Sequence, residues 1–247
     1  MDDLKKRARQ LGIRALVTHW DEFAGQPWIK QLLDKEDEER QRRSFERRIR
    51  EAHIGEFKPL AEFDWKWPRA VDREAIDELM QLDFIKENSN VVLRGPNGIG
   101  KTMIAKNFAY QALMAGYKTR FVPASQMLSD LAQHDGASAR QRCLRRYTSV
   151  DLLVIDEVGY LSYANNYADL LYEVLNARYL KKSTIVTTNR IFEEWSEVFP
   201  HAACVVTLVD RLIHKADVIS IDADSFRNRE AMERAAQKAK TRKRKSA

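Results

Sequence analysis

The chain has 247 residues, 44% of them hydrophobic, and a net charge of +6. This length and apolar content indicate a globular protein with one full-sized α/β domain and a smaller appendage. The beginning, MDDLKKRAR, is charged where a signal peptide needs an apolar stretch, and no run reaches the ~18 apolar residues of a membrane span. Only Cys143 and Cys204 occur, without a CxxC pair, which argues against a disulfide framework or a structural zinc site. We therefore expect a cytoplasmic protein with no membrane partner.

Two helices are expected at the beginning of the chain. Residues 2–24 place apolar side chains near helical spacing after an acidic start, and a second helical pattern runs from residue 27 to about residue 54. Residues 1–57 are therefore predicted to form a small α-helical N-terminal domain. The segment RQRRSFERRIR, residues 40–50, fits a solvated helix face with ion pairs to Glu36, Glu38 and Glu39, and it equally fits a surface that contacts phosphates.

From residue 71 onward, helical and strand patterns alternate. Residues 58–70 are expected to form a connector whose aromatic side chains pack onto the following domain. The expected strands are 91–94, 119–124, 152–157, 184–189 and 218–222. The expected helices are 72–87, 101–115, 125–133, 166–180 and 205–215. Such alternation predicts an α/β fold, with a parallel sheet flanked by helices, over residues 71–226.

The stretch GPNGIGKT matches the pattern G-x-x-x-x-G-K-[ST] between a short aliphatic strand and the start of a helix. Glycine permits backbone torsions and close approach that a Cβ blocks, so successive N–H groups can turn toward phosphate oxygens. Lys101 is expected to reach the β- and γ-phosphates, and the Thr102 hydroxyl to bind Mg²⁺. The alternative is a glycine-rich turn that only joins a strand to a helix. The motif predicts a nucleoside triphosphate site made by Gly95, Pro96, Asn97, Gly98, Ile99, Gly100, Lys101 and Thr102.

Polar residues follow two of the later apolar strands. Asp156 and Glu157 come at the end of LLVIDE, where two adjacent acids are costly unless they are used. Asp156 is expected to hold Mg²⁺, and Glu157 to orient and deprotonate an attacking water, although a pair that caps the next loop is the alternative. Asn189 ends STIVTTN and is a candidate sensor of the γ-phosphate or a simple turn residue. The acidic pair favours hydrolysis of the triphosphate.

With these motifs the chain resembles the IstB-type insertion-sequence ATP-binding proteins, which belong to the AAA+ class and are related to the DnaC helicase loaders. The resemblance covers almost the whole chain and rests on GPNGIGKT, LLVIDEVGYL, TTN, EWSEVFP and VVTLVDRLIHKAD. It implies an AAA+ core after a helical N-terminal region and an ATPase stimulated by double-stranded DNA and by assembly of a homo-oligomer. It also implies that the protein assists a transposase in target selection and integration.

The resemblance assigns a role to Arg211 as well. It implies that this arginine reaches the ATP of a neighbouring subunit; a surface arginine paired with Asp210 or Asp217 is the alternative. The chain departs from the family in SFRNREA, where relatives more often carry Ser-Tyr-Arg, so a nucleotide-sensing role of Arg227 stays open. Only 25 residues follow the last expected strand, which predicts a truncated AAA+ lid.

Basic residues gather in two further places. Residues 227–247 hold nine Lys and Arg against two Glu, so this predicted basic C-terminal helix or tail carries +7 and the rest of the chain −1. The tail, with Lys243 and Arg244, is a candidate DNA contact or a solvated extension. The stretch ARQRCLRRY is a second candidate or a solvated helix face, and its arginines are Arg140, Arg142, Arg145 and Arg146.

The function that we expect is ATP-dependent DNA binding with ATP hydrolysis in support of a transposase. A helicase loader with the same core is the alternative, and it differs in its protein partner. A nucleotide or nucleoside kinase needs an acceptor pocket under an arginine-bearing lid, for which the chain offers no clear candidate. A DNA scaffold that binds ATP without hydrolysing it is a third possibility.

Overall fold

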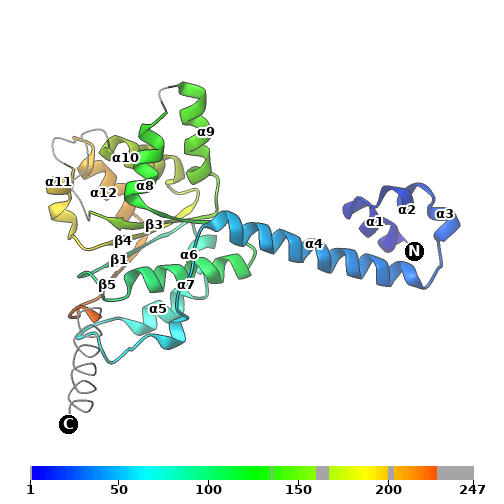
Figure 1. Ribbon diagram of the computed structural model, residues 1–247, viewed down its shortest axis with the longest axis horizontal. Coiled ribbons are helices and arrows are strands. Elements are labelled where there is room, and N and C mark those ends of the chain that lie inside the picture. The colour runs from blue at the N-terminus through cyan, green and yellow to red at the C-terminus, as the bar shows by residue number, and fades with distance from the viewer. Residues whose placement is uncertain (1, 135, 160–166, 200–202, 227–247) are drawn as a thin grey trace, which may run out of the picture. The chain divides into compact units, whose positions relative to one another are not determined.

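The computed structural model describes residues 2–134, 136–159, 167–199 and 203–226 (Figure 1). The chain divides into two compact units, residues 1–50 and residues 51–247. Among the described helices, none is long and apolar enough to cross a membrane.

The first unit is built from three short helices and most of a long one. Its helices are α1 (Asp2–Gln10), α2 (Arg14–Thr18), α3 (Trp20–Phe23) and α4 (Trp28–Ala52). The expected single helix over residues 2–24 is wrong, because the chain turns at Gly12, whose φ is +61°, and again at His19. These turns let one small core form, which consists of Ala8, Leu11, Leu16, Trp20, Ile29 and Leu33.

The charged middle of α4 is stabilised by ion pairs along its own surface. Arg40 pairs with Glu36 at 2.6 Å, and Arg42 pairs with Glu39 at 2.7 Å. Glu39 also accepts a contact from Arg43 at 3.3 Å. This is the pattern of a solvated helix face, on which exposed ion pairs of this spacing contribute little to stability.

The second unit is an α/β domain around one parallel sheet. The strand order is β2-β3-β4-β1-β5, and all four pairings are parallel, which confirms the predicted parallel sheet. The strands are β1 (Asn90–Arg94), β2 (Thr119–Pro123), β3 (Leu152–Val158), β4 (Ser183–Thr188) and β5 (Ala216–Ser220). Residues 152–155 and 183–188 are buried throughout because these strands lie in the interior of the sheet.

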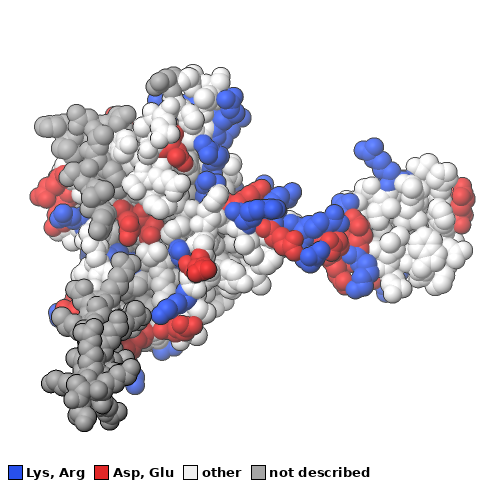
Figure 2. Space-filling view, in the orientation of Figure 1, with Lys and Arg blue, Asp and Glu red and all other residues white. Residues whose placement is uncertain are grey.

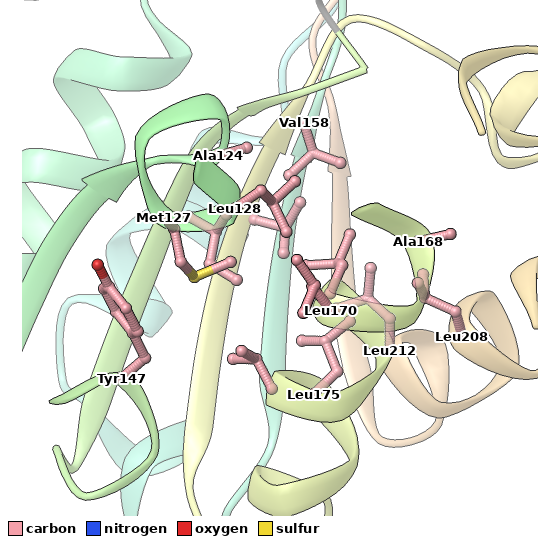
Figure 3. Packing of buried hydrophobic residues seen from close by; sticks show 14 of the residues in the cluster. Ala124, Met127, Leu128, Tyr147, Val158, Ala168, Leu170, Leu175, Leu208 and Leu212 are labelled. Atoms are coloured by element: carbon pink, nitrogen blue, oxygen red, sulfur yellow. The ribbon is translucent and has the colours of Figure 1, made fainter. Parts of the chain in front are cut away.

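Helices cover both faces of this sheet. The α-helices are α5 (Arg73–Leu79), α6 (Asp83–Lys86), α7 (Lys101–Met114), α8 (Ala124–Ala132), α9 (Ala137–Thr148), α10 (Tyr167–Arg178), α11 (Trp195–Val198) and α12 (Val205–Ile213), and the 3₁₀ turns are η1 (Leu60–Glu62) and η2 (Phe192–Glu194). Side chains of α8, α10 and α12 interdigitate on one face, where Leu128, Leu170 and Leu212 meet (Figure 3). On the other face, α7 contacts β1 to β4 (Figure 1).

Two details of the helices differ from expectation. The helix expected over residues 72–87 divides into α5 and α6, because Leu82 adopts a left-handed conformation with φ of +66°. Helix α9 carries the arginine-rich stretch and was not expected as a separate element. Leucine rarely takes a positive φ, so the break between α5 and α6 at Leu82 has no signature in the sequence.

A buried arginine joins the elements at the start of β3 and β4. Arg178 is 1% exposed and donates to the carbonyl groups of Tyr147 and Val150 at 2.9 Å each. It also donates to the hydroxyl of Thr184 at 3.0 Å. Burial lowers the pKa of Arg178 to about 9, while the nearby Asp151 opposes the shift. The guanidinium therefore stays charged at neutral pH, and the carbonyl oxygens around it compensate for its lost hydration.

Candidate nucleotide-binding site

A cavity of about 440 Å³ opens where β1, β3 and β4 end. Ligands in parallel α/β sheets bind at this edge, beyond the carboxyl ends of the strands. The cavity is lined by Lys58, Glu62, Phe63, Asp64, Trp67, Asn97, Gly98, Ile99, Gly100, Lys101, Thr102, Met103, Glu157, Thr188, Asn189 and Phe226. Most of the residues predicted from GPNGIGKT are therefore brought together with Glu157 and Asn189.

The glycine-rich loop between β1 and α7 is packed against other segments of its own unit. Gly95, Gly98 and Gly100 have φ values of +151°, +78° and +102°. A Cβ on Gly95 would lie 2.1 Å from the carbonyl oxygen of Ile221, and a Cβ on Gly100 would lie 2.5 Å from Cε2 of Phe63. Side chains are thus excluded at both positions by close neighbours as well as by backbone conformation.

Lys101 is held against the loop that precedes it. Lys101 is 8% exposed, and its Nζ donates to the carbonyl oxygens of Gly95 at 2.6 Å and of Pro96 at 2.7 Å. Lys101 is also the first residue of α7, where backbone N–H groups lack partners within the helix and the helix dipole is positive. The ammonium group and the helix start together favour an anion in the adjacent cavity.

Asp156 lies beside Thr102, which lines the cavity, whereas Asp156 itself is not among the lining residues. The Thr102 hydroxyl donates to both carboxylate oxygens of Asp156 at 3.1 Å, and the Thr187 hydroxyl donates to Oδ1 at 2.6 Å. Asp156 is 6% exposed, so these two hydroxyl groups compensate for much of its lost hydration. The hydroxyl and carboxylate oxygens are the hard donors that Mg²⁺ prefers, and the pair therefore fits the predicted metal site.

Glu157 is turned out of the strand by an irregularity in the sheet. The register of β3 against β4 shifts between Ile155 and Val158, and Glu157 has a φ of +62°. Its backbone N–H donates to the Thr187 hydroxyl at 2.9 Å, which fixes the irregularity from β4. A bulge of this kind redirects a side chain, and here it places the exposed Glu157 on the wall of the cavity while Asp156 stays buried. Sequence reasoning missed Thr187, whose only signal is the pair of threonines that ends β4.

Asn189 follows β4 directly and lines the same cavity. The loop and this strand are tied together, because the N–H of Gly95 donates to the carbonyl oxygen of Thr188 at 3.2 Å. The Thr188 hydroxyl accepts from the N–H of Arg190 at 3.1 Å, which shapes the turn in which Asn189 stands. Asn189 is therefore a turn residue that lines the cavity, and its role as a sensor of the γ-phosphate stays a prediction.

The connector supplies an aromatic wall that the sequence did not assign to the site. The Phe63 ring lies against Gly100, and Trp67 packs edge to face with Phe226 at 6.0 Å between ring centroids. The indole N–H of Trp67 donates to the carbonyl oxygen of Asp224 at 2.8 Å. The expected packing of these aromatic side chains on the following domain is therefore found, and it occurs at the cavity.

The family of IstB-like ATP-binding proteins matches residues 5–234. The chain belongs to this family. It is 32% identical over 239 residues to the ATP-binding protein of insertion sequence IS21 from Pseudomonas aeruginosa, a match that covers 93% of this chain and 90% of the relative. It is 34% identical over 203 residues to the corresponding protein of insertion sequence IS5376 from Geobacillus stearothermophilus, covering 82% of this chain and 81% of the relative.

The solved structures that resemble this family member establish the AAA+ fold. DnaI superimposes with a TM-score of 0.56 at 17% identity, over 66% of this chain and 90% of that one. The replication initiator DnaA bound to AMPPCP and single-stranded DNA superimposes with a TM-score of 0.53 at 20% identity, over 66% and 52% of the two chains. The predicted fold class and family are thereby confirmed.

Arg211 lies in the last turn of α12 and does not line the cavity of its own chain. Its guanidinium stands 5.0 Å from the ring centroid of Tyr172 and 5.5 Å from that of Tyr179. No ion pair joins it to Asp210 or Asp217 among the described residues. The two rings hold the guanidinium by cation–π attraction, so the alternative of a simple acid-paired surface arginine is not what the structure shows.

Of the residues predicted to contact DNA, the arginines of α9 are the ones that the structure describes. Lys and Arg side chains gather over this helix on the face shown in Figure 2. Arg140 pairs with Glu173, whereas Arg142, Arg145 and Arg146 are exposed. Lys243, Arg244 and Arg227 lie outside the described residues. The helix thus offers exposed positive charge, as either interpretation of this stretch requires.

Proposed function

We propose that the protein is an ATPase that binds ATP with Mg²⁺ in the cavity at the ends of β1, β3 and β4. The observation that carries the proposal is the contact of Thr102 with Asp156 at 3.1 Å, at the start of α7, with Glu157 exposed beside it. A hydroxyl, a buried carboxylate and an exposed carboxylate in this arrangement have distinct chemical roles in phosphoryl transfer. Membership of a family of ATP-binding proteins supports ATP as the nucleotide.

The residues of the site divide the reaction among them. Lys101 exchanges the carbonyl oxygens of the loop for oxygens of the β- and γ-phosphates, and the N–H groups of residues 98–102 surround the phosphate chain. Thr102 and Asp156 would hold Mg²⁺, which would neutralise charge on the phosphates. Glu157 accepts a proton from the attacking water, and Asn189 orients the γ-phosphate from the end of the neighbouring strand β4. The base packs on the wall formed by Phe63 and Trp67.

We further propose that ATP controls self-assembly and grip on double-stranded DNA in support of a transposase, and that hydrolysis releases the complex. Two relatives, which match 93% and 82% of this chain, are named as insertion-sequence proteins, and this favours the role over that of a helicase loader. Likeness to DnaI concerns the fold alone at 17% identity. Exposed arginines on α9 supply the charge that a DNA backbone attracts. We place this activity in the cytoplasm.

The test is phosphate release from Mg²⁺ and ATP by the full chain, with and without duplex DNA, beside retention of that DNA with and without ATP. The proposal expects hydrolysis that DNA stimulates and DNA retention that ATP increases. ATP binding without measurable hydrolysis under both conditions would instead identify a nucleotide-bound scaffold.

A further inference from the structure

Residues 56–63, which include the beginning of the connector, run along one side of α7, the helix that follows the phosphate loop. Near the solvent, Lys106 Nζ donates to the carbonyl oxygen of Glu56 at 3.1 Å, and the rings of Phe57 and Tyr110 lie 5.5 Å apart. Both contacts are made by half-buried or exposed side chains of α7. They guide the connector, but water can replace the hydrogen bond at little cost.

Asn107, between these positions on α7, makes a buried contact of a different kind. It is 8% exposed, and its Oδ1 accepts from the N–H of Leu60 at 2.9 Å. Its Nδ2 donates to the carbonyl oxygens of Lys58 at 3.0 Å and of Met103 at 2.8 Å. The oxygen and both hydrogens of the amide are thus used, and two backbone groups of the connector depend on one side chain. An apolar side chain here would leave both groups without a partner.

The clamped segment leads directly into the wall of the cavity. Leu60 begins η1 (Leu60–Glu62), and Phe63 follows it with its ring against Gly100 of the phosphate loop. Lys58 and Phe63 both line the cavity, whereas Asn107 itself does not. At its other end the connector is held by the carbonyl oxygen of Asp222, which accepts from the N–H of Arg69 at 2.7 Å. Asn107 on α7 therefore holds the other end of this segment, near Leu60.

We propose that Asn107 is a positioning residue for nucleotide binding, which acts through the connector and not by touching the nucleotide. It holds the Phe63 ring against Gly100 of the phosphate loop, where the ring forms part of the cavity wall on which a base can pack. The inference rests on the proposed ATP site, and it assigns the base and the phosphates to different parts of the chain. Binding of the phosphates depends on the loop and the start of α7, and binding of the base depends on the contacts of Asn107 with the backbone of Lys58 and Leu60.

The test uses Asn107→Leu in the full chain, with calorimetric titrations of Mg²⁺–ATP and of Mg²⁺–tripolyphosphate, which lacks the base and ribose. ATP affinity is expected to fall about 5- to 160-fold, which corresponds to the ~1–3 kcal/mol that base stacking on an aromatic side chain contributes. Tripolyphosphate affinity is expected to change less than about twofold, since its contacts lie on the loop. Hydrogen exchange at the Leu60 N–H should rise at the same time, because its acceptor is gone.

A matched control is Asn90→Leu. Asn90 stands at the opposite end of β1 from the phosphate loop and clamps backbone in the same way, donating to the Leu212 carbonyl and accepting from the Thr184 N–H, both at 3.0 Å. This variant should lose stability without preferring one ligand over the other. Unchanged ATP affinity in Asn107→Leu, or an equal loss for both ligands, would overturn the inference. A wild-type chain that binds no ATP would refute the proposed function itself.

Discussion

Replacing Lys101 by Met removes the ammonium group and keeps the aliphatic stem, so the change isolates a charge. In the structure this charge is shared between two carbonyl oxygens at 2.6 and 2.7 Å. When ATP binds, the same group turns to phosphate oxygens that carry a full charge, and each charge-assisted hydrogen bond contributes about 1.5–3 kcal/mol. After subtraction of the two carbonyl contacts, we expect a net loss of about 2–4 kcal/mol, or roughly 30- to 700-fold in ATP affinity.

Equilibrium titration with a fluorescent ATP analogue measures this loss. Lys106→Met is the matched control, because Lys106 also lies on α7 and donates to a carbonyl oxygen at 3.1 Å but does not line the cavity. Its ATP affinity should stay within about twofold of the wild-type value. If Lys101→Met bound ATP within threefold of wild type, the assignment of this loop to phosphate would be refuted.

Arg211→Ala should still bind ATP but lose DNA-stimulated hydrolysis, because the neighbouring subunit's site is then incomplete. Mixing this variant with Lys101→Met should restore part of the activity. Full activity of Arg211→Ala alone would show that a different residue reaches the neighbouring subunit's ATP. Removing residues 238–247, which hold six Lys and Arg, should weaken binding to all DNA sequences. It should also reduce the slope of log affinity against log salt by about 0.9 per lost phosphate contact. The double variant Arg145→Ala/Arg146→Ala should instead weaken DNA binding mainly when ATP is present. Titrations at several salt concentrations check both variants, and an unchanged slope after truncation would assign the tail to a solvated extension.

The residues that meet at the candidate site could be predicted from the sequence where they lie in short contiguous motifs. GPNGIGKT and the acidic pair at Asp156 each carry their chemistry within a few positions, and a strand before each motif fixes the edge of the sheet at which they meet. The alternation of helix and strand patterns likewise predicted a parallel sheet with helices on both faces. These features are local or periodic, so a single sequence reveals them.

The parts that could not be predicted depend on contacts between distant segments. Thr187 reaches Asp156 across 31 residues, and Asn107 holds Leu60 across 47 residues. No periodicity connects such pairs, and an asparagine within an apolar helix carries no mark of what it binds. The left-handed Leu82 and Glu157 are similar cases, since tertiary packing and sheet register impose conformations that their side chains disfavour.

Steady-state phosphate release by Glu157→Gln tests the central claim most directly, beside the wild-type chain at saturating ATP and Mg²⁺ with duplex DNA. Thr102 and Asp156 remain in contact in this variant, so ATP binding should persist, but an amide cannot accept the proton of the attacking water. The account predicts a loss of about 100- to 10,000-fold in turnover with ATP affinity preserved. Turnover near the wild-type rate would contradict it, and would show that the exposed carboxylate at the end of β3 is not the base.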